Sequence, residues 1–397
     1  MPTIQSFCDA VLNLQPVNLL EYTKVIPEFL ALKQCNQSPL HHAEGDVLVH
    51  ADMALKEVLP LLDQIEKPED KVALYISTML HDIGKPSTYG VNKKGNVTAY
   101  GHDKVGVPLA KDFLFKYFPE VNYPIKNKIL SLIEWHMRPR EFMKNGVADR
   151  KLKILSLCVN TKLLYLLSTA DTLGRKAEDM SGGCELLAKF KQECERLNIW
   201  DKPFNIPGSD LLSNHAYSIA RWNILMNGRP ETQETLDQAV KLASVLPKFQ
   251  LLILCGPPGA GKSTYRENLL KQFPGTKVCS MDDKRQELLG DVNDQSANSE
   301  MFRICCVELR IAMQKRQNVI WDCTSASKAH RKVIIDIARR HGALIGCVFF
   351  DLPYQTLLER NVNREKKVPE SVVTEYYYKR MERVESYEAD KVTIISQ

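Results

Sequence analysis

The run GPPGAGKS, Gly256–Ser263, has the residue types and the spacing that hold the phosphates of a nucleotide. It follows the apolar segment LLILC and precedes a segment compatible with a helix, which is the context that the GxxxxGK[ST] pattern requires. Backbone N–H groups at a helix N-terminus would surround phosphate oxygens, Lys262 would reach the β- and γ-phosphates, and Ser263 would ligate Mg²⁺. The residues predicted to bind ATP or another NTP with Mg²⁺ are Gly256, Gly259, Ala260, Gly261, Lys262, Ser263 and Thr264.

A second set of residues with metal-binding chemistry lies upstream. It comprises His50, His81, Asp82, His102, His136 and Asp171. A single histidine on a helix is more often a packed or surface residue than a ligand, so the hypothesis depends on the whole set. Imidazole together with carboxylate favours one or two transition-metal ions, such as Mn, Ni, Co or Zn, over Mg²⁺ alone. In one arrangement Asp82 bridges two ions. The first ion is also held by His50, His81 and Asp171, and the second by His102 and His136. Water acidified by such ions would attack a phosphate ester.

Further charged residues follow the apolar runs after the glycine-rich segment. The strand expected next, before CSMDDKRQ, would present Asp282, Asp283 and Arg285 at its carboxyl end, where ligands of open α/β sheets bind. A carboxylate there can accept the proton of an attacking hydroxyl, and an arginine one helical turn later can clamp an acceptor phosphate. For Asp283 the alternative is the N-cap of the following helix. These residues predict an acceptor site for the transferred phosphoryl group.

Two more segments extend this second half. The run NVIWDC predicts a strand that ends at Asp322. The run FFDLPYQTLLERNVNRE predicts a strand followed by a basic helix, on which Arg360 and Arg364 would share one face because they are four residues apart. A solvated helix face is the alternative for these two arginines.

The elements that must position these residues differ between the two halves of the chain. From roughly residue 45 to 200, apolar residues recur every three or four positions, which predicts helices. The segment DKPFNIPGSD predicts a break, and a helical connector ends near Pro247. Beyond it, short apolar runs alternate with helical stretches, which predicts a parallel sheet. We therefore expect an all-α domain at residues 1–200, a helical connector at 201–247 and an α/β P-loop domain at 248–397.

The composition suits a protein that binds an acidic ligand and resides in a reducing compartment. The 397 residues carry a net charge of +5, which suits an acidic ligand without demanding a long nucleic acid. The eleven cysteines have irregular spacings without a CxxC pair, which favours a reducing compartment. Neither a signal peptide nor an apolar run of membrane-spanning length is evident, so we expect a cytoplasmic protein without a membrane partner.

The order of elements in the second half resembles the kinase module of phage-type RNA/DNA 5′-hydroxyl kinases, which carry a DDxR element after the P-loop. The resemblance implies that Asp282 is the general base and that Arg285 clamps the acceptor phosphate. It implies that Arg364 is the lid arginine over the donor phosphates, acting with Lys262. It also matches Asp322 to an active-site aspartate, which we assign to acceptor binding.

The upstream set forms the signature of HD phosphohydrolases. The segments HHAEGDVLVH, LHDIGKP, YGHDKVG, EWHMRP and ADTLGR resemble the HD domain of some bacterial tRNA CCA-adding enzymes. This resemblance implies hydrolysis of 2′,3′-cyclic phosphates and 2′-phosphates, with 3′-phosphates left open. Lys85 and Arg175 are candidate phosphate contacts, although Lys85 could instead cap its helix. His41 and His42 are expected to be accessory.

Together the two halves resemble the bacterial HD-domain polynucleotide kinases, which are bifunctional end-healing enzymes. The resemblance implies an NTP donor, RNA ends as substrates with DNA ends as an open alternative, and an RNA ligase that acts downstream. One alternative is an HD nucleotidase fused to a nucleoside or sugar kinase, against which the DDKR element argues. Another is a nucleotide sensor whose ATP site regulates the HD domain. The sensor would be expected to have lost catalytic residues, but all four are present: Lys262, Asp282, Arg285 and Arg364.

Overall fold

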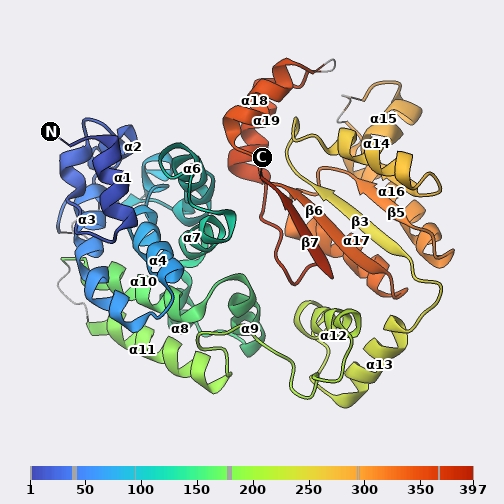
Figure 1. Ribbon diagram of the computed structural model, residues 1–397, viewed down its shortest axis with the longest axis horizontal. Coiled ribbons are helices and arrows are strands. Elements are labelled where there is room, and N and C mark those ends of the chain that lie inside the picture. Colours follow the sequence, from blue (N-terminus) through green and yellow to red (C-terminus); the bar gives the residue numbers. More distant parts are fainter. Residues whose placement is uncertain are drawn as a thin grey trace. The chain divides into compact units, whose positions relative to one another are not determined.

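The computed structural model describes residues 2–37, 43–93, 95–176, 181–292, 294, 296–364 and 367–396. The chain forms two compact units, Met1–Phe204 and Asn205–Gln397, whose elements are drawn in Figure 1. The connector was predicted at residues 201–247, and its residues 205–247 belong to the second unit. The limits of the functional domains at residues 200 and 247 stay a prediction.

The first unit is almost entirely helical. Its helices are α1 (Ile4–Leu12), η1 (Leu19–Tyr22), α2 (Pro27–Lys33), α3 (Val47–Val58), η2 (Leu59–Gln64), α4 (Pro68–Leu80), α5 (Lys85–Thr88), α6 (His102–Tyr117), α7 (Tyr123–Trp135), α8 (Arg138–Asn145), α9 (Asp149–Cys158), α10 (Thr161–Leu173) and α11 (Ser181–Arg196). Between α5 and α6, strands β1 (Gly90–Val91) and β2 (Val97–Thr98) form an antiparallel hairpin. Local caps fix two of the central helices: Asp46 accepts from Val49 N at 2.9 Å and begins α3, and Asn160 accepts from Leu163 N at 3.0 Å and begins α10.

Helices α3, α4, α7 and α10 pack against one another at the centre of this unit. Their facing positions are filled by buried apolar side chains, among them Leu48, Ile76, Ile129 and Leu167. His50 lies on α3 and Asp171 on α10, whereas His81 and His136 directly follow α4 and α7. The packing of four helices therefore fixes the relative positions of four predicted ligands that are far apart in the sequence.

The second unit is built on a five-stranded sheet. Its helices are α12 (Asn214–Asn227), α13 (Gln233–Ala243), α14 (Lys262–Gln272), α15 (Met281–Leu289), α16 (Asn298–Gln314), α17 (Lys328–Arg339), α18 (Tyr354–Val362), α19 (Glu370–Glu375) and the π-helix η3 (Tyr376–Arg380). Its strands are β3 (Gln250–Cys255), β4 (Lys277–Ser280), β5 (Val319–Asp322), β6 (Leu344–Phe350) and β7 (Lys391–Ile395). They lie in the order β4-β5-β3-β6-β7, and every adjacent pair is parallel. The predicted fold class, an all-α domain followed by an α/β P-loop domain with a parallel sheet, is confirmed.

This topology places the central strand β3 directly before the glycine-rich loop. Because all five strands are parallel, the residues that follow β3, β4 and β5 meet at one edge of the sheet. Below the loop, Leu254, Ile320, Val348 and Phe350 form a buried core. Helix α12 contacts α17 of the same unit, since Trp222 Nε1 donates a hydrogen bond to Asp336 Oδ1 at 2.7 Å.

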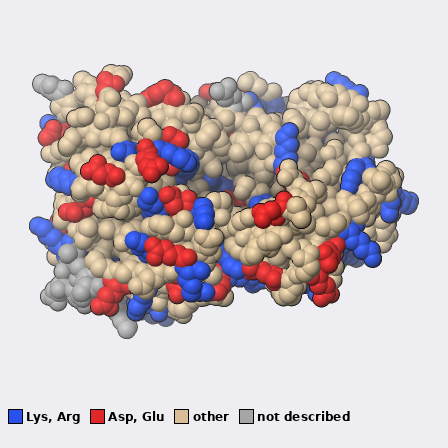
Figure 2. Space-filling view, turned by 60° about the horizontal axis from the view of Figure 1, so that its bottom comes forward, with Lys and Arg blue, Asp and Glu red and all other residues tan. Residues whose placement is uncertain are grey.

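The outer surface carries charges of both signs. On the face drawn in Figure 2, Lys and Arg side chains are interspersed with Asp and Glu side chains, so positive charge is not gathered into one basic area there. Among the described helices, no single one is long and apolar enough to cross a membrane. Helices α9 and α10 pass that test only as a pair, which is bent by 92°.

Candidate active sites

The six predicted metal ligands of the first unit are buried and lie together. They form two groups, in each of which the ligand atoms lie within 4.8 Å of one another: His50, His81 and Asp171, and Asp82, His102 and His136. Asp82 faces both groups. Its Oδ2 lies 3.3 Å from His81 Nε2, and its Oδ1 lies 3.2 Å from His102 Nε2. This is the geometry of a carboxylate that can contribute one oxygen to each of two adjacent ions.

The hydrogen bonds of the four histidines test whether these residues fit a metal. In each ring, Nδ1 lies within hydrogen-bonding distance of a backbone carbonyl oxygen: His50 with Gly174 (3.2 Å), His81 with Thr78 (2.8 Å), His102 with Ala99 (2.8 Å) and His136 with Ile133 (2.7 Å). A carbonyl only accepts, so Nδ1 carries the proton and the lone pair lies on Nε2. The Nε2 atoms are nevertheless 3.3 Å apart in the His50–His81 pair and 3.2 Å apart in the His102–His136 pair. Two lone pairs at that separation repel unless a cation lies between them, so the donor set fits a bound metal.

The electrostatics of the site point the same way. Burial raises the pKa of Asp82 and of Asp171, but neighbouring positive groups hold both pKa values well below their usual range, with His81 acting on Asp82 and Arg140 and Arg175 on Asp171. Burial lowers the pKa of His81, yet the two carboxylates raise it to about 10. The two carboxylates therefore stay ionised at neutral pH and attract a cation.

Gly84, in the HDIGKP segment, lets two ligand-bearing backbones meet. A Cβ at this position would lie 2.2 Å from His102 O and 2.7 Å from Gly106 N. The turn after Asp82 therefore rests directly on the start of α6, which carries His102. Only glycine fits at this contact.

A pocket of about 700 Å³ opens beside Asp82 and His102. Its basic lining residues are Lys85, Lys104, Arg138 and Arg175. Lys85 Nζ lies 2.6 Å from Asp82 Oδ2 and donates to Gln37 Oε1 at 2.6 Å. Among the described residues, Lys85 Nζ thus contacts side chains of the pocket and caps no helix. His41 and His42 lie outside the described residues.

Sequence reasoning missed two residues that hold the ligands. Arg140, on α8, forms an ion pair with Asp171 Oδ2 and donates to Thr172 Oγ1 at 3.3 Å. Glu44 Oε1 lies 3.1 Å from His50 Nδ1, and both side chains are fully buried. Their positions gave some signal, since Arg140 follows the EWHMRP segment directly and Glu44 lies within HHAEGDVLVH.

The GPPGAGKS run of the second unit forms the loop that follows β3 and the first two residues of α14. Gly259 and Gly261 have φ angles of +82° and +94°, which side chains other than glycine rarely adopt. Lys262 Nζ donates to Gly256 O at 2.7 Å and to Pro257 O at 2.9 Å, so its ammonium group lies over the loop. Burial lowers the pKa of Lys262. Ser263 and Thr264, which follow it, are exposed on the first turn of α14.

Asp322 ends β5 beside this loop and is buried, which raises its pKa. Its Oδ2 lies 2.9 Å from Arg266 Nη1, which also lies 3.3 Å from Asp283 Oδ2. Arg266 was not predicted, although its place four residues after Lys262 puts both on one face of α14. The N-cap alternative for Asp283 is wrong, because Ser280 caps α15 by accepting from Asp283 N at 3.2 Å.

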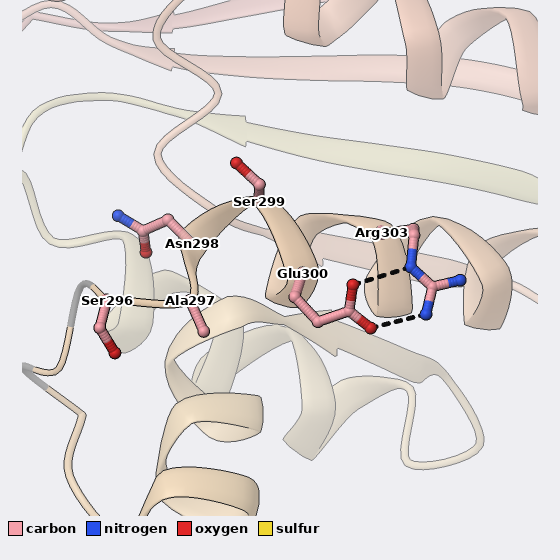
Figure 3. Close-up of a pocket in the computed structure, with 6 residues that line it drawn as sticks. All are labelled: Ser296, Ala297, Asn298, Ser299, Glu300 and Arg303. Atoms are coloured by element: carbon pink, nitrogen blue, oxygen red, sulfur yellow. Dashed lines mark hydrogen bonds and ion pairs between the residues drawn. The ribbon is translucent and has the colours of Figure 1, made fainter.

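Arg285 is buried, and its guanidinium contacts two side chains. Its Nη1 forms an ion pair with the exposed Asp282, and its Nε and Nη2 donate to Asn298 Oδ1 at 3.2 and 2.7 Å. Asn298 begins α16 and lines a cavity of about 470 Å³, which Figure 3 shows with the ion pair of Glu300 and Arg303 further along the helix. Asn298 thus holds the guanidinium beside the carboxylate of Asp282, a role that sequence reasoning missed.

The basic helix expected for Arg360 and Arg364 is shorter than predicted. Helix α18 ends at Val362, and Asn363 closes it by donating from Nδ2 to a carbonyl one turn back. Arg364 therefore lies beyond the helix, and the shared face does not form. Arg360 Nη1 donates to Ala260 O at 3.3 Å, whereas Arg364 is exposed.

Comparison with known families finds one match within each unit. Residues 48–168 match the HD domain family, and residues 251–384 match a family described as AAA domain. The chain therefore joins an HD-type phosphohydrolase domain, which implies divalent metal binding, to a P-loop domain of the phosphotransferase kind. This is the domain content of the HD-domain polynucleotide kinases that the sequence resembles.

Known relatives match single parts of the chain. The A-adding tRNA nucleotidyltransferase of Deinococcus radiodurans is 32% identical over 105 residues, which are 26% of this chain and 22% of that protein. The mitochondrial GTP:AMP phosphotransferase of Saccharomyces cerevisiae is 28% identical over 156 residues, which are 35% of this chain and 69% of that protein. A solved structure titled "Structure of the Pnkp1/Rnl/Hen1 RNA repair complex" aligns with 24% identity and a TM-score of 0.31, covering 34% of this chain and 44% of that one. The chain spans about a fifth of the length of the nucleotidyltransferase.

Proposed function

We propose that this chain heals both ends of a broken RNA. Cleavage that uses the ribose 2′-hydroxyl as nucleophile leaves a 2′,3′-cyclic phosphate on one end and a 5′-hydroxyl on the other. The first unit would hydrolyse the cyclic phosphate and the resulting 2′-phosphate, and the second would phosphorylate the 5′-hydroxyl. The proposal rests on the presence of two sites in one chain. The first is the buried pair of His/Asp ligand groups next to a pocket, and the second is the P-loop with the Asp282–Arg285 ion pair.

In the first unit, the ligand set suits Mn, Ni, Co or Zn. When bound, such ions lower the pKa of water and polarise phosphoryl oxygens. Lys85 and Arg175 line the pocket next to Asp82 and would bind the phosphate oxygens through charge-assisted hydrogen bonds. Adding water across one P–O bond opens the ring and leaves a monoester, and a second hydrolysis releases phosphate.

In the second unit, Mg²⁺ enters with ATP or another NTP, and Ser263 would contribute a ligand to it. Lys262 and Arg364 would bind the donor phosphates, while Arg285 would bind a phosphate of the acceptor. Asp282 would take the proton of the 5′-hydroxyl as its oxygen bonds to the γ-phosphorus and the bond to the nucleoside diphosphate breaks. The exposure of the Asp282 side chain, 62%, leaves it open to an acceptor.

The substrates follow from this chemistry. A 2′,3′-cyclic phosphate requires a ribose, so the first unit would act on RNA, whereas the second could use the 5′ end of RNA or DNA. The healed ends, a 5′-phosphate and a 3′-terminal ribose without phosphate, are those that an RNA ligase joins. We therefore expect such a ligase to act next.

A second candidate is an HD nucleotidase joined to a small-molecule kinase. The likeness to a GTP:AMP phosphotransferase favours it, because that relative's name specifies a mononucleotide as acceptor. Under this alternative, Arg285 would bind the phosphate of a mononucleotide, and a long acceptor would bring no gain in rate.

An end-resolved assay separates the two candidates. A short RNA with a 5′-hydroxyl and a 2′,3′-cyclic phosphate is incubated with ATP, Mg²⁺ and Mn²⁺, in parallel with AMP and a free nucleoside. We expect both RNA ends to be converted. Asp282→Ala should lower phosphorylation by roughly 10²- to 10⁴-fold with hydrolysis unchanged, and Asp82→Ala should do the reverse. Rapid phosphorylation of AMP with inert RNA ends would replace the proposal by the second candidate.

A further inference from the structure

We propose that the pocket of the first unit binds the terminal nucleoside together with its phosphate, and that Tyr89 and Tyr100 form the surface on which the base stacks. The inference rests on the proposed function and adds a base subsite to it. Both tyrosines line the pocket, and they are 48% and 80% exposed. Within the described part of the chain, neither ring takes part in a hydrogen bond or a ring pair. The structure thus leaves two aromatic faces open beside the ligand groups.

The backbone places these rings within reach of a phosphate at the ligand groups. Tyr100 precedes His102 by two residues, so their Cα atoms are at most about 7 Å apart. Tyr89 directly follows α5, which begins at Lys85. The pairing of Gly90 with Thr98 in the hairpin brings the two tyrosine-bearing ends of the strands together. A nucleoside whose phosphate contacts the ligand groups would therefore have its base near the hairpin.

The size and the lining of the pocket fit this occupant. A volume of about 700 Å³ lies in the range of pockets that enclose a drug-sized molecule and exceeds the need of a phosphate group. Gln37, Asn96 and Thr98 add polar groups to the lining, and Lys104 adds an exposed positive charge. Stacking on an aromatic ring is tolerant of sequence because every base has a π-face. We therefore expect a subsite that accepts purines and pyrimidines alike.

The test uses two probes that share the reactive ring and differ in the base. Adenosine 2′,3′-cyclic phosphate carries the nucleoside, and ethylene phosphate carries the five-membered cyclic diester alone. In the full-length protein loaded with Mn²⁺, Tyr100→Ala should lower kcat/KM for the nucleotide by roughly 5- to 150-fold, mainly through KM, and leave ethylene phosphate unchanged. Tyr100→Phe should retain the activity because it keeps the ring. Calorimetry with adenosine 2′-phosphate in metal-free protein, which should not hydrolyse this ligand, should give the same loss of affinity for Tyr100→Ala.

The matched control is Val91→Ala, because Val91 is 60% exposed on the same hairpin but does not line the pocket. It should change neither probe. Equal losses on both probes in Tyr100→Ala would mean a structural role and overturn the inference, and so would no loss in Tyr100→Ala and Tyr89→Ala alike. A wild-type protein that opens ethylene phosphate but not the nucleotide would refute the proposed function itself.

Discussion

The substitution Gly84→Ala puts the assembly of the ligand groups to a direct test. The new Cβ would lie 2.2 Å from His102 O, and ordinary contact begins at 3.4 Å, so the turn after Asp82 and the start of α6 must separate by about 1.2 Å. Metal–ligand distances tolerate deviations of only about 0.2 Å. Asp82 and His102 belong to the same ligand group, so the shift should weaken metal binding. A misplacement of about 1 Å can cost about 100-fold in rate, which is the loss that we expect in cyclic-phosphate hydrolysis.

The assay measures metal content, cyclic-phosphate hydrolysis and 5′-phosphorylation in the same preparation. Phosphorylation is the internal control for folding of the second unit and should not change. Gly106→Ala is the matched control, because its Cβ would lie 3.4 Å from Ile133 Cγ2 and 3.5 Å from Gly84 N, which are ordinary contacts. If Gly84→Ala protein bound metal normally and hydrolysed the cyclic phosphate within about threefold of the wild-type rate, this account of the glycine would be refuted.

Three further outcomes are expected. Exhaustive chelation should abolish cyclic-phosphate hydrolysis, measured on an oligonucleotide. If the chelated protein hydrolysed the cyclic phosphate at the full rate, the metal hypothesis would be excluded. Arg285→Ala should slow phosphorylation of a 3′-phosphorylated acceptor by roughly 10- to 150-fold. Asn298→Ala should raise KM for that acceptor more than it lowers kcat. If the wild-type protein phosphorylated a bare nucleoside equally well, the role of Arg285 in binding the acceptor phosphate would be contradicted. Lys262→Ala should remove phosphorylation and leave hydrolysis intact, whereas loss of both activities in parallel assays would favour a nucleotide sensor.

The ligand set could be predicted because its members are unusual in their positions. A single buried-type histidine is usually a packed residue, but six histidines and aspartates in the order of the HD signature could be singled out together. The contact of Gly84 with the start of α6 could not be predicted, because nothing in either segment specifies which helix passes within 2.2 Å. Arg140 was missed for a related reason: a charge on a short helix usually faces solvent, and only the packing of α8 directs it to Asp171.

In the second unit, the rule that parallel strands end at one edge of the sheet predicted the site residues at the strand ends. It did not predict the site residues in the segments between the strands. Asp282 and Asp322 were predicted because each ends an apolar run and such ends share one edge of the sheet. Asn298 lies thirteen residues after Arg285, across a connection whose path no local pattern determines. The predicted face of Arg360 and Arg364 failed at Asn363, whose side chain competes for the backbone and ends the helix early.

Arg175 links the ligand groups to the pocket. Its Nη2 lies 2.7 Å from Asp171 Oδ1, the same oxygen that lies 3.1 Å from His50 Nε2, and Arg175 also lines the pocket. Arg140 holds the other oxygen of Asp171, so the carboxylate would keep its orientation if Arg175 turned away. A phosphate entering the pocket would compete with Asp171 for Arg175 and so leave Oδ1 with more negative charge to offer a metal ion held beside His50. Because such competition is reciprocal, occupancy of the pocket by an anion and the ligand strength of Asp171 should rise together.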